Sequence, residues 1–396
     1  MSTINEPYYI NNRLMEMTKG YNSQISGEAP VYTSDMLEYI GHFYDYSHSA
    51  MKYKDDTKEN KRYGAASSYD CRFYLDQAKM YYTATKKAPF EVKMLEAYYC
   101  MLNLAKSYIS FKSDYVDDFV ADFSRHGIKE DHEGDGKDFS TIKVQYDKIH
   151  FRNKNGQRVP VDKYGGVFPM FAGMLDPDFQ SKWSSETGKS LKTLLYNLPF
   201  VQSSYMNTYG SSKNRIDELF IPLAKKSAPY YYKATKTSLK LRAEIDEGYY
   251  SAEGGRFKDE MLSTFGEDLE FSAEGYFDSV NTAKKYSNNS ISTDIKDLNT
   301  TLRRNFVYNG GNHPVWFIKR TRLNNEDVLN ISTITINMAI MHRLSEIARY
   351  KPEQLQRLME SKENWLLHEY MQAALDQFID EMASEITGHE VKFSQW

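Results

Sequence analysis

The chain has 396 residues, of which 41% are hydrophobic and 26% are charged, so it is long and apolar enough to bury a large core. Its formal net charge of -4 excludes a strong global attraction to nucleic acid and leaves only a local basic face for such binding. We find no run of 18 apolar residues and no basic segment followed by an apolar one at the N-terminus. The sequence therefore indicates neither a membrane span nor a signal peptide and predicts a cytoplasmic protein.

Residues 1–60 are expected to form an N-terminal arm with one or two short helices. A short apolar and aromatic segment runs from Met36 to Tyr44, within polar sequence, and the charged run from Lys52 to Arg62 follows it. Such a short apolar segment favours short helices rather than a long one.

Residues 61–138 are expected to form the helical core. Apolar side chains recur at spacings of three and four in residues 71–82 and again in residues 94–109, and Pro89 lies where the second helix should begin. Two long helices with a short connection favour an antiparallel hairpin. Cys71 and Cys100 lie on these helix faces beside aromatic residues, and we interpret them as buried thiols rather than as a disulfide or a nucleophile.

Residues 139–330 are expected to be a mixed region with β-rich inserts. Apolar and polar residues alternate in residues 141–158 around an Asn155-Gly156 turn signal, which predicts a hairpin or a three-stranded insert. Strand patterns return in residues 239–245, 305–308 and 315–318, and a short helix before Pro199 is also expected. The pattern leaves open whether the Gly-rich stretch 248–289 is ordered.

Residues 331–396 are expected to form C-terminal helices that pack on the core, because helical periodicity returns there. Pro352 disfavours helix at Lys351, so the first of these helices should end near Tyr350 with Arg349 in its last turn. Arg349 and Tyr350 are candidate binding residues for a phosphate or a partner, and helix capping is the alternative. Helix, strand and helix in this order, without βαβ alternation, predict an α+β fold that is mainly α.

Arg125, His126 and His132 form the one group of residues that has the composition of a catalytic site. An arginine can hold a phosphate while a histidine moves a proton, which suffices for metal-free cleavage of RNA through its 2′-hydroxyl. The acidic residues nearby in the sequence would raise the pKa of the histidine and repel phosphate. The alternative is a structural turn in which Gly127 takes a special dihedral angle.

A metal site would require the acidic residues of this segment to converge. Nine carboxylates lie between Asp114 and Asp138 against three Lys or Arg residues. A metal-dependent nuclease would need several of them around one ion. The first four fall on one side of a helix, where crowded carboxylates usually stay solvated, so we expect neither a metal nor a cofactor.

Residues 97–106, AYYCMLNLAK, are similar to the Tyr-Tyr-containing helix of HEPN domains, which are four- to five-helix modules of prokaryotic toxins and RNases. The order of motifs over about residues 65 to 390 resembles the YaaC-like family more specifically. The motifs are this helix, the His126-Gly127 turn, residues 165–169 (GGVFP), residues 194–199, and residues 344–352 with Trp365 after them.

This resemblance implies a bacterial protein with a HEPN-like helical core and with relatives among anti-phage genes. Arg125 and His132 have the Arg-to-His spacing of the HEPN signature, although glycines crowd a segment that should begin a helix, and the YaaC-like pattern emphasises His126 instead. The first hypothesis is an interaction protein that acts through a protein partner, a homo-oligomer or RNA in phage defence. The alternative is a metal-independent endoribonuclease that uses Arg125 with His132 or His126.

Overall fold

The computed structural model describes most of the chain, and the statements below concern the described residues. They are residues 5–10, 12–19, 29–54, 64–112, 119–120, 123–130, 136–146, 148–154, 157–176, 178–185, 187–210, 218–224, 228–248, 262–272, 275–284, 295, 298, 301–311, 314–323 and 325–394. The chain forms two compact units. Unit 1 comprises residues 1–36, 209–330 and 383–396, and unit 2 comprises residues 37–208 and 331–382.

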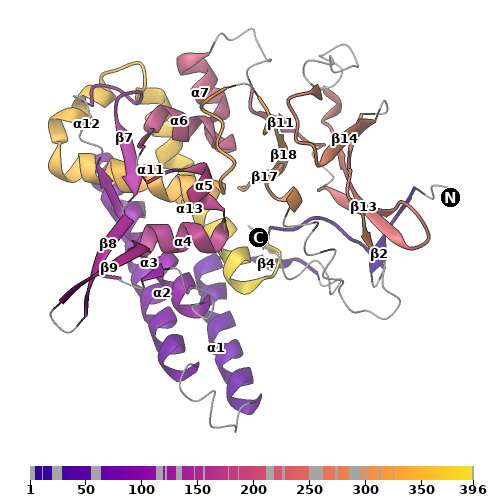
Figure 1. The fold of residues 1–396 in the computed structure, drawn as a ribbon, viewed down its shortest axis with the longest axis horizontal. Coiled ribbons are helices and arrows are strands. Elements are labelled where there is room, and N and C mark those ends of the chain that lie inside the picture. The colour runs from indigo at the N-terminus through magenta and orange to yellow at the C-terminus, as the bar shows by residue number, and fades with distance from the viewer. Residues whose placement is uncertain are drawn as a thin grey trace. The chain divides into compact units, whose positions relative to one another are not determined.

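Unit 2 is built on the helices α2 (Gly64–Lys87) and α3 (Phe90–Lys112), which pack side by side (Figure 1). Pro89 lies directly before α3, so the predicted helical hairpin is confirmed. The apolar side chains of α3 are buried along the helix, from Met94 to Ile109. Cys71 and Cys100 are both buried and free, as expected from their positions on the helix faces.

The first helix is longer than the sequence indicated. Helix α1 (Met36–Lys54) has 19 residues, whereas one or two short helices were expected. Tyr44 explains how its central part is held, because its ring packs on Phe111 of α3 and its hydroxyl is 2.9 Å from Ser107 Oγ. Ser107 in turn donates to the Cys71 carbonyl at 2.7 Å. These contacts anchor the predicted first half of α1 on α3.

The predicted strands between residues 141 and 165 are confirmed as two small sheets. Strand β7 (Lys143–Tyr146) pairs with β6 (Ile128–Glu130) and β10 (Lys189–Ser190), and β9 (Gln157–Gly165) pairs with β8 (Lys148–Lys154) and β5 (Phe119–Val120). The hairpin pairs Lys154 with Gln157. The Asn155-Gly156 turn lies outside the described residues.

Short helices follow these sheets. They are α4 (Val167–Leu175), α5 (Phe179–Lys182), α6 (Leu191–Tyr196), the 3₁₀ helix η4 (Pro199–Val201) and α7 (Gln202–Tyr209). Ser190 caps α6 by accepting a hydrogen bond from the Thr193 N–H at 3.0 Å. The short helix expected before Pro199 is therefore confirmed.

The last helices are α11 (Thr333–Tyr350), α12 (Pro352–Met359) and α13 (Asn364–Thr387). Helix α11 ends at Tyr350 as predicted, and Pro352 is at the start of α12, where its missing N–H has no consequence. Helix α11 packs on α3. Tyr370 of α13 donates its hydroxyl to Asn337 of α11, 2.8 Å from Oδ1 and 2.9 Å from the carbonyl oxygen.

Unit 1 contains a six-stranded antiparallel sheet of β1 (Glu6–Pro7), β12 (Tyr230–Lys233), β13 (Ser238–Glu244), β15 (Tyr276–Ser279) and β14 (Leu269–Ser272), in this order, with β16 (Ala283–Lys284) also on β13. Alternate residues of β13 are buried, as the predicted strand pattern requires. The buried side chains join the core of the unit, which includes Leu241 and Phe277.

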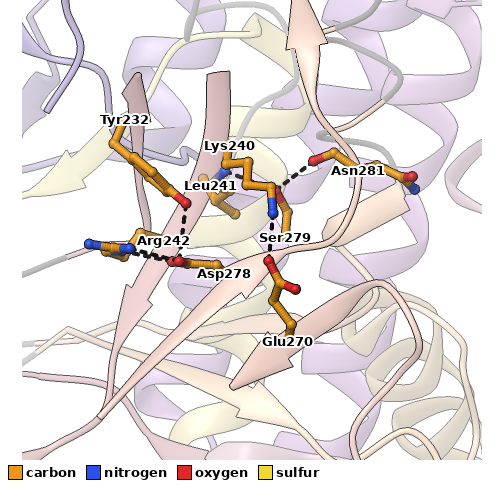
Figure 2. A network of polar contacts seen from close by, with 8 residues as sticks. All are labelled: Tyr232, Lys240, Leu241, Arg242, Glu270, Asp278, Ser279 and Asn281. Atoms are coloured by element: carbon orange, nitrogen blue, oxygen red, sulfur yellow. Dashed lines mark hydrogen bonds and ion pairs between the residues drawn. The ribbon is translucent and has the colours of Figure 1, made fainter. Parts of the chain in front are cut away.

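The other face of this sheet carries a polar network (Figure 2). Asp278 accepts two hydrogen bonds of 2.7 Å from the Arg242 guanidinium and one of 3.1 Å from the Tyr232 hydroxyl. The rings of Tyr232 and Tyr276 lie 4.3 and 4.9 Å from Arg242 Cζ. Cross-strand pairs of this kind fix the register of the sheet.

Smaller sheets complete unit 1. Strand β18 (Val315–Lys319) lies between β11 (Phe220–Pro222) and β17 (Phe306–Asn309), β2 (Tyr9–Ile10) pairs with β3 (Arg13–Leu14), and β4 (Val31–Thr33) is parallel to β19 (Val391–Phe393). The predicted strands at β17 and β18 are confirmed. The fold is α+β and mainly α. Among the described residues, none of the helices combines the length and apolar character that crossing a membrane requires.

Candidate functional site at the His126 turn

Two glycines fix the backbone around His126. Gly127 has a positive φ of 79°, which confirms the special dihedral angle expected for this turn. Gly166, at the start of α4, has a φ of 101°, and a Cβ atom built there would be 2.7 Å from both Gly127 Cα and Gly127 N. The contact brings together two of the sequence motifs named above, the His126-Gly127 turn and the GGVFP segment.

Backbone hydrogen bonds hold the turn in place. The Val167 N–H donates to the Arg125 carbonyl at 3.0 Å, and the Phe168 N–H donates to the His126 carbonyl at 2.9 Å. Both donors belong to the first turn of α4, whose N–H groups have no partner within the helix. The beginning of α4 therefore sets the position of the His126 backbone.

Three aromatic rings from separate elements meet at this turn. The His126 centroid is 5.4 Å from Tyr98 of α3 and 5.6 Å from His342 of α11, and Tyr98 and His342 are 4.8 Å apart. Both pairs that include His342 are close to perpendicular, the edge-to-face arrangement that aromatic rings favour. Tyr98 and His342 are 0% and 2% exposed, and His126 is half-buried.

Arg349 extends this cluster to the surface. Its guanidinium carbon is 5.7 Å from the Tyr99 ring and 4.8 Å from the Tyr350 ring, and it donates a 3.0 Å hydrogen bond to the Tyr350 hydroxyl. Tyr99 is stacked on Tyr81 of α2 with centroids 5.2 Å apart. Arg349 and Tyr350 are both exposed. The two candidate groups of the sequence, the His126 turn and the Arg349-Tyr350 pair, thus share one corner of unit 2.

The electrostatics at His126 are opposite to the expectation. Burial lowers the pKa of His126, and the positive charges of Lys106 and Arg349 lower this pKa further. The prediction that acidic neighbours raise the histidine pKa is therefore wrong, because the ring is partly buried and because α3 and α11 provide cations that are remote in the sequence. Burial also holds the pKa of His342 well below its usual value, with His126, Arg343 and Arg349 contributing. Both imidazoles are neutral at pH 7.

Two cations of the corner have no acidic partner. Lys106 lies 5.4 Å above the Tyr74 ring, and burial lowers its pKa. Within the described ranges, neither Lys106 nor Arg349 pairs with a carboxylate. The nearby Glu346 is occupied instead, with its Oε2 at 3.1 Å from Arg343 and 3.6 Å from Nδ1 of His342. Among the described residues, the positive charges of Lys106 and Arg349 thus lie beside a neutral imidazole without a paired carboxylate, which suits an anion.

The buried side of the cluster is polar but sparsely bonded. Neither the Tyr98 hydroxyl nor Nδ1 of His342 has a hydrogen-bond partner among the described residues. The Tyr98 hydroxyl can donate a hydrogen bond, and a neutral imidazole can donate from one nitrogen and accept at the other. Burial also raises the pKa of Tyr98 well above its usual value, so its hydroxyl is protonated at pH 7.

The other predicted site residues are distributed differently. Arg125 is exposed, and its backbone carbonyl helps to hold the turn. His132 lies outside the described residues, as do the first four carboxylates of the acidic segment. Asp138 is described and forms a local turn: its carboxylate accepts hydrogen bonds from Ser140 and Thr141, which lower its pKa. No group of three or more metal-binding side chains occurs in the described part of the chain.

Sequence reasoning missed Lys106, His342 and Glu346. A signal for two of them exists, because His342, Glu346 and Arg349 are spaced four and three residues apart and must share one face of α11. Polar residues on the same face as a candidate arginine would have identified His342. Lys106 is the last residue of the AYYCMLNLAK motif, but the sequence does not place it near His126, which only the packing of α3 against the turn does.

A protein-family model described as "YaaC-like Protein" matches residues 39–386 of the chain. This match includes the whole of the His126 corner. Neither a curated protein nor a solved structure matches the chain.

Proposed function

The chain belongs to the YaaC-like family, and we propose that it is an RNA-interacting protein that binds an RNA phosphate at the His126 corner. The observation that supports this is a pair of cations, Lys106 and Arg349, whose charges act on His126 and which pair with no carboxylate among the described residues. A guanidinium binds phosphate oxygens through a planar fork of donors, and an ammonium group binds them as a point charge. The Tyr350 ring, 67% exposed and next to Arg349, adds an aromatic surface at the same place.

The net charge of the chain leads to an expectation for how RNA binding depends on salt. Because the whole protein is acidic, we expect binding to depend on few phosphate contacts and to weaken with salt in proportion to their number. Each phosphate contact to a single strand contributes a slope of roughly 0.7 in log affinity against log salt. A protein that used two cations would therefore show a shallow slope.

The test compares two exposed arginines. Binding of a labelled single-stranded RNA is measured over a range of salt concentrations for the natural protein, Arg349→Ala and Arg357→Ala. Arg357 lies on α12, is exposed and bonds only a backbone carbonyl, so it is the matched control. We expect Arg349→Ala to weaken binding about fivefold to tenfold and to reduce the salt slope, as the loss of a charged hydrogen bond at an exposed site would. Equal effects of the two variants would disprove the role of the corner.

A second function, metal-independent endoribonuclease, is favoured by the state of His126. A neutral, half-buried imidazole next to phosphate-binding cations can take the proton of a 2′-hydroxyl. The 2′-oxygen then attacks phosphorus, the 5′-oxygen leaves with a proton from water, and the products are a 2′,3′-cyclic phosphate and a 5′-hydroxyl end. Arg349 and Lys106 would stabilise the charge that develops on the phosphate.

Cleavage of tRNA or total RNA in EDTA tests this second function. His126→Ala should abolish the products, and His42→Ala, an exposed histidine of α1, should not change them. Arg125→Ala and His132→Ala test the two other catalytic candidates. If no RNA is cleaved, or if all four variants are as active as the natural protein, the endoribonuclease hypothesis is wrong while RNA binding stays open to its own test.

The same proposal includes two further points. The core formed by α2, α3 and α11 is HEPN-like, and the protein acts in phage defence. Both come from the resemblance of the Tyr98-Tyr99 helix and the motifs after it. Phage plating on cells that express the natural protein or Arg349→Ala tests the role in defence. Protection that depends on Arg349 would support it, and equal plating on all strains would contradict it.

A further inference from the structure

Unit 1 contains a cavity of about 340 Å³ that is separate from the His126 corner. Its lining comes from the β2–β3 hairpin and the residues after it, from β18, and from the segment that leads into β19. The apolar part of the lining includes Leu14, Met15, Met17 and Trp316. A volume at the lower end of the range of small-molecule sites, roughly 300 to 1,000 Å³, fits a ligand with a single ring or a short chain.

Charged side chains surround this apolar part. Arg13 and Lys392 line the cavity from the hairpin and from β19, and neither forms an ion pair within the described ranges. Both are accessible to solvent, Arg13 exposed and Lys392 partly so. Two cations that form no ion pair with a described residue, beside the apolar part of the lining, favour a ligand with an anionic group and an apolar body.

The lining also contains two acidic side chains, Glu16 and Glu390, and one histidine, His389. Glu390 is buried, and its Oε2 already accepts a 2.7 Å hydrogen bond from the Lys19 N–H. The Lys19 side chain lies behind the lining: it is buried, donates to the Val391 carbonyl and lies 4.6 Å above the Tyr308 ring. The Glu390 carboxylate is therefore held by the segment behind the cavity, whereas Arg13 and Lys392 are accessible to a ligand.

Trp316 gives the cavity a rigid aromatic wall. It is largely buried, with the Arg303 guanidinium carbon 5.1 Å from its ring and Tyr308 packed edge-on at 5.3 Å. These neighbours hold the indole in place in the absence of a ligand, and a wall that needs no ordering on binding favours affinity.

We propose that this cavity binds a small apolar carboxylate, with the apolar body against Trp316 and the carboxylate between Arg13 and Lys392. The inference does not depend on RNA binding, because every lining residue belongs to unit 1. It predicts discrimination by charge, since a neutral molecule of the same shape fills the cavity without contacting the cations.

The test titrates the full-length protein with 3-phenylpropanoate and with the neutral 3-phenylpropan-1-ol, followed by calorimetry and by tryptophan fluorescence. For a ligand of this size we expect a dissociation constant on the order of 0.1 to 1 mM. The alcohol should bind at least about tenfold more weakly, as should the carboxylate to Arg13→Gln or Lys392→Gln. Lys236→Gln removes an exposed lysine at the turn after β12 and should leave the affinity unchanged.

Ala228→Phe tests the cavity itself, because Ala228 is part of the lining and a phenyl group there would occupy the space. Binding should be lost while the circular dichroism of the protein is unchanged. Absence of saturable binding to the natural protein, equal binding of acid and alcohol, or full binding by Ala228→Phe would each overturn the proposal. An effect of Lys236→Gln as large as that of Lys392→Gln would overturn the role of the two cations.

Discussion

Gly166→Ala is the substitution that most directly tests how the His126 turn is built. The residue has a φ of 101° and a ψ of 171°, a backbone region that only glycine adopts without strain. Forcing another residue into it costs about 1 to 3 kcal/mol. The new Cβ would also lie 2.7 Å from Gly127 Cα and 3.1 Å from the Arg125 carbonyl oxygen.

These contacts decide the magnitude. All of them are to backbone atoms, so no side chain can rotate away, and overpacking of this kind adds about 1 to 3 kcal/mol. We therefore expect Gly166→Ala to lower the free energy of unfolding of unit 2 by about 4 kcal/mol. Gly311→Ala is the control: Gly311 has a similar φ of 98° but nothing within 4 Å of the added atom, so its cost is about 1 to 2 kcal/mol.

Urea unfolding followed by tryptophan fluorescence measures both effects. Trp183 is buried in unit 2 and Trp316 in unit 1, so unfolding of either unit changes the environment of a buried tryptophan. Histidine NMR resonances would show whether the His126 ring moves in the Gly166 variant. If Gly166→Ala costs no more than Gly311→Ala, the close contact between the two glycines does not constrain the turn, and our account of the site geometry is wrong.

Three further predictions concern other parts of the chain. Asp278→Ala should destabilise unit 1 by about 2 to 4 kcal/mol, because it leaves the Arg242 guanidinium, whose side chain is 15% exposed, without its carboxylate (Figure 2). The control Glu6→Gln breaks a surface pair with Lys233 and should cost less than about 1 kcal/mol. Equal urea midpoints of the two variants would contradict this prediction. Burial lowers the pKa of His126 and His342 in the folded state, so the unfolded chain binds more protons below its histidine pKa of about 6.5. The free energy of unfolding should therefore fall as the pH drops through this value, by up to about 1.4 kcal/mol per pH unit for each histidine. A His342→Gln variant whose free energy of unfolding keeps the full dependence on pH would refute this assignment. Burial raises the pKa of the Cys100 thiol, and Cys71 is equally enclosed, so neither should react with a thiol reagent in native buffer although both react in urea; labelling of the native protein would contradict their burial.

The elements predicted best are those in which a local pattern and the packing agree. The α2–α3 hairpin follows from apolar spacing and from Pro89, and the end of α11 follows from Pro352, because proline excludes a helical residue before it. The alternation in β13 predicts both its strand and its buried face. In each case the information lies within one or two helical turns or one strand.

The anchoring of α1 on α3 is an instance in which the packing adds to the local pattern. The sequence predicts a short helix around Met36 to Tyr44, and the structure extends it to Lys54. Tyr44 contacts Ser107 and Phe111, which are more than 60 residues away in the sequence, and a local sequence pattern cannot predict such contacts. The same holds for unit 1, which is assembled from three separated stretches and joins β4 to β19 in parallel.

The His126 corner shows most clearly what each level decides. The sequence determined that a histidine would precede a turn glycine with positive φ and that an arginine would lie in the last turn of a C-terminal helix. It also predicted the wrong sign for the pKa shift of His126, since it counted charges along the chain. Only the tertiary structure decided that the corner is cationic, because electrostatic interactions depend on distance in space, and the folded chain places Lys106 and Arg349 there.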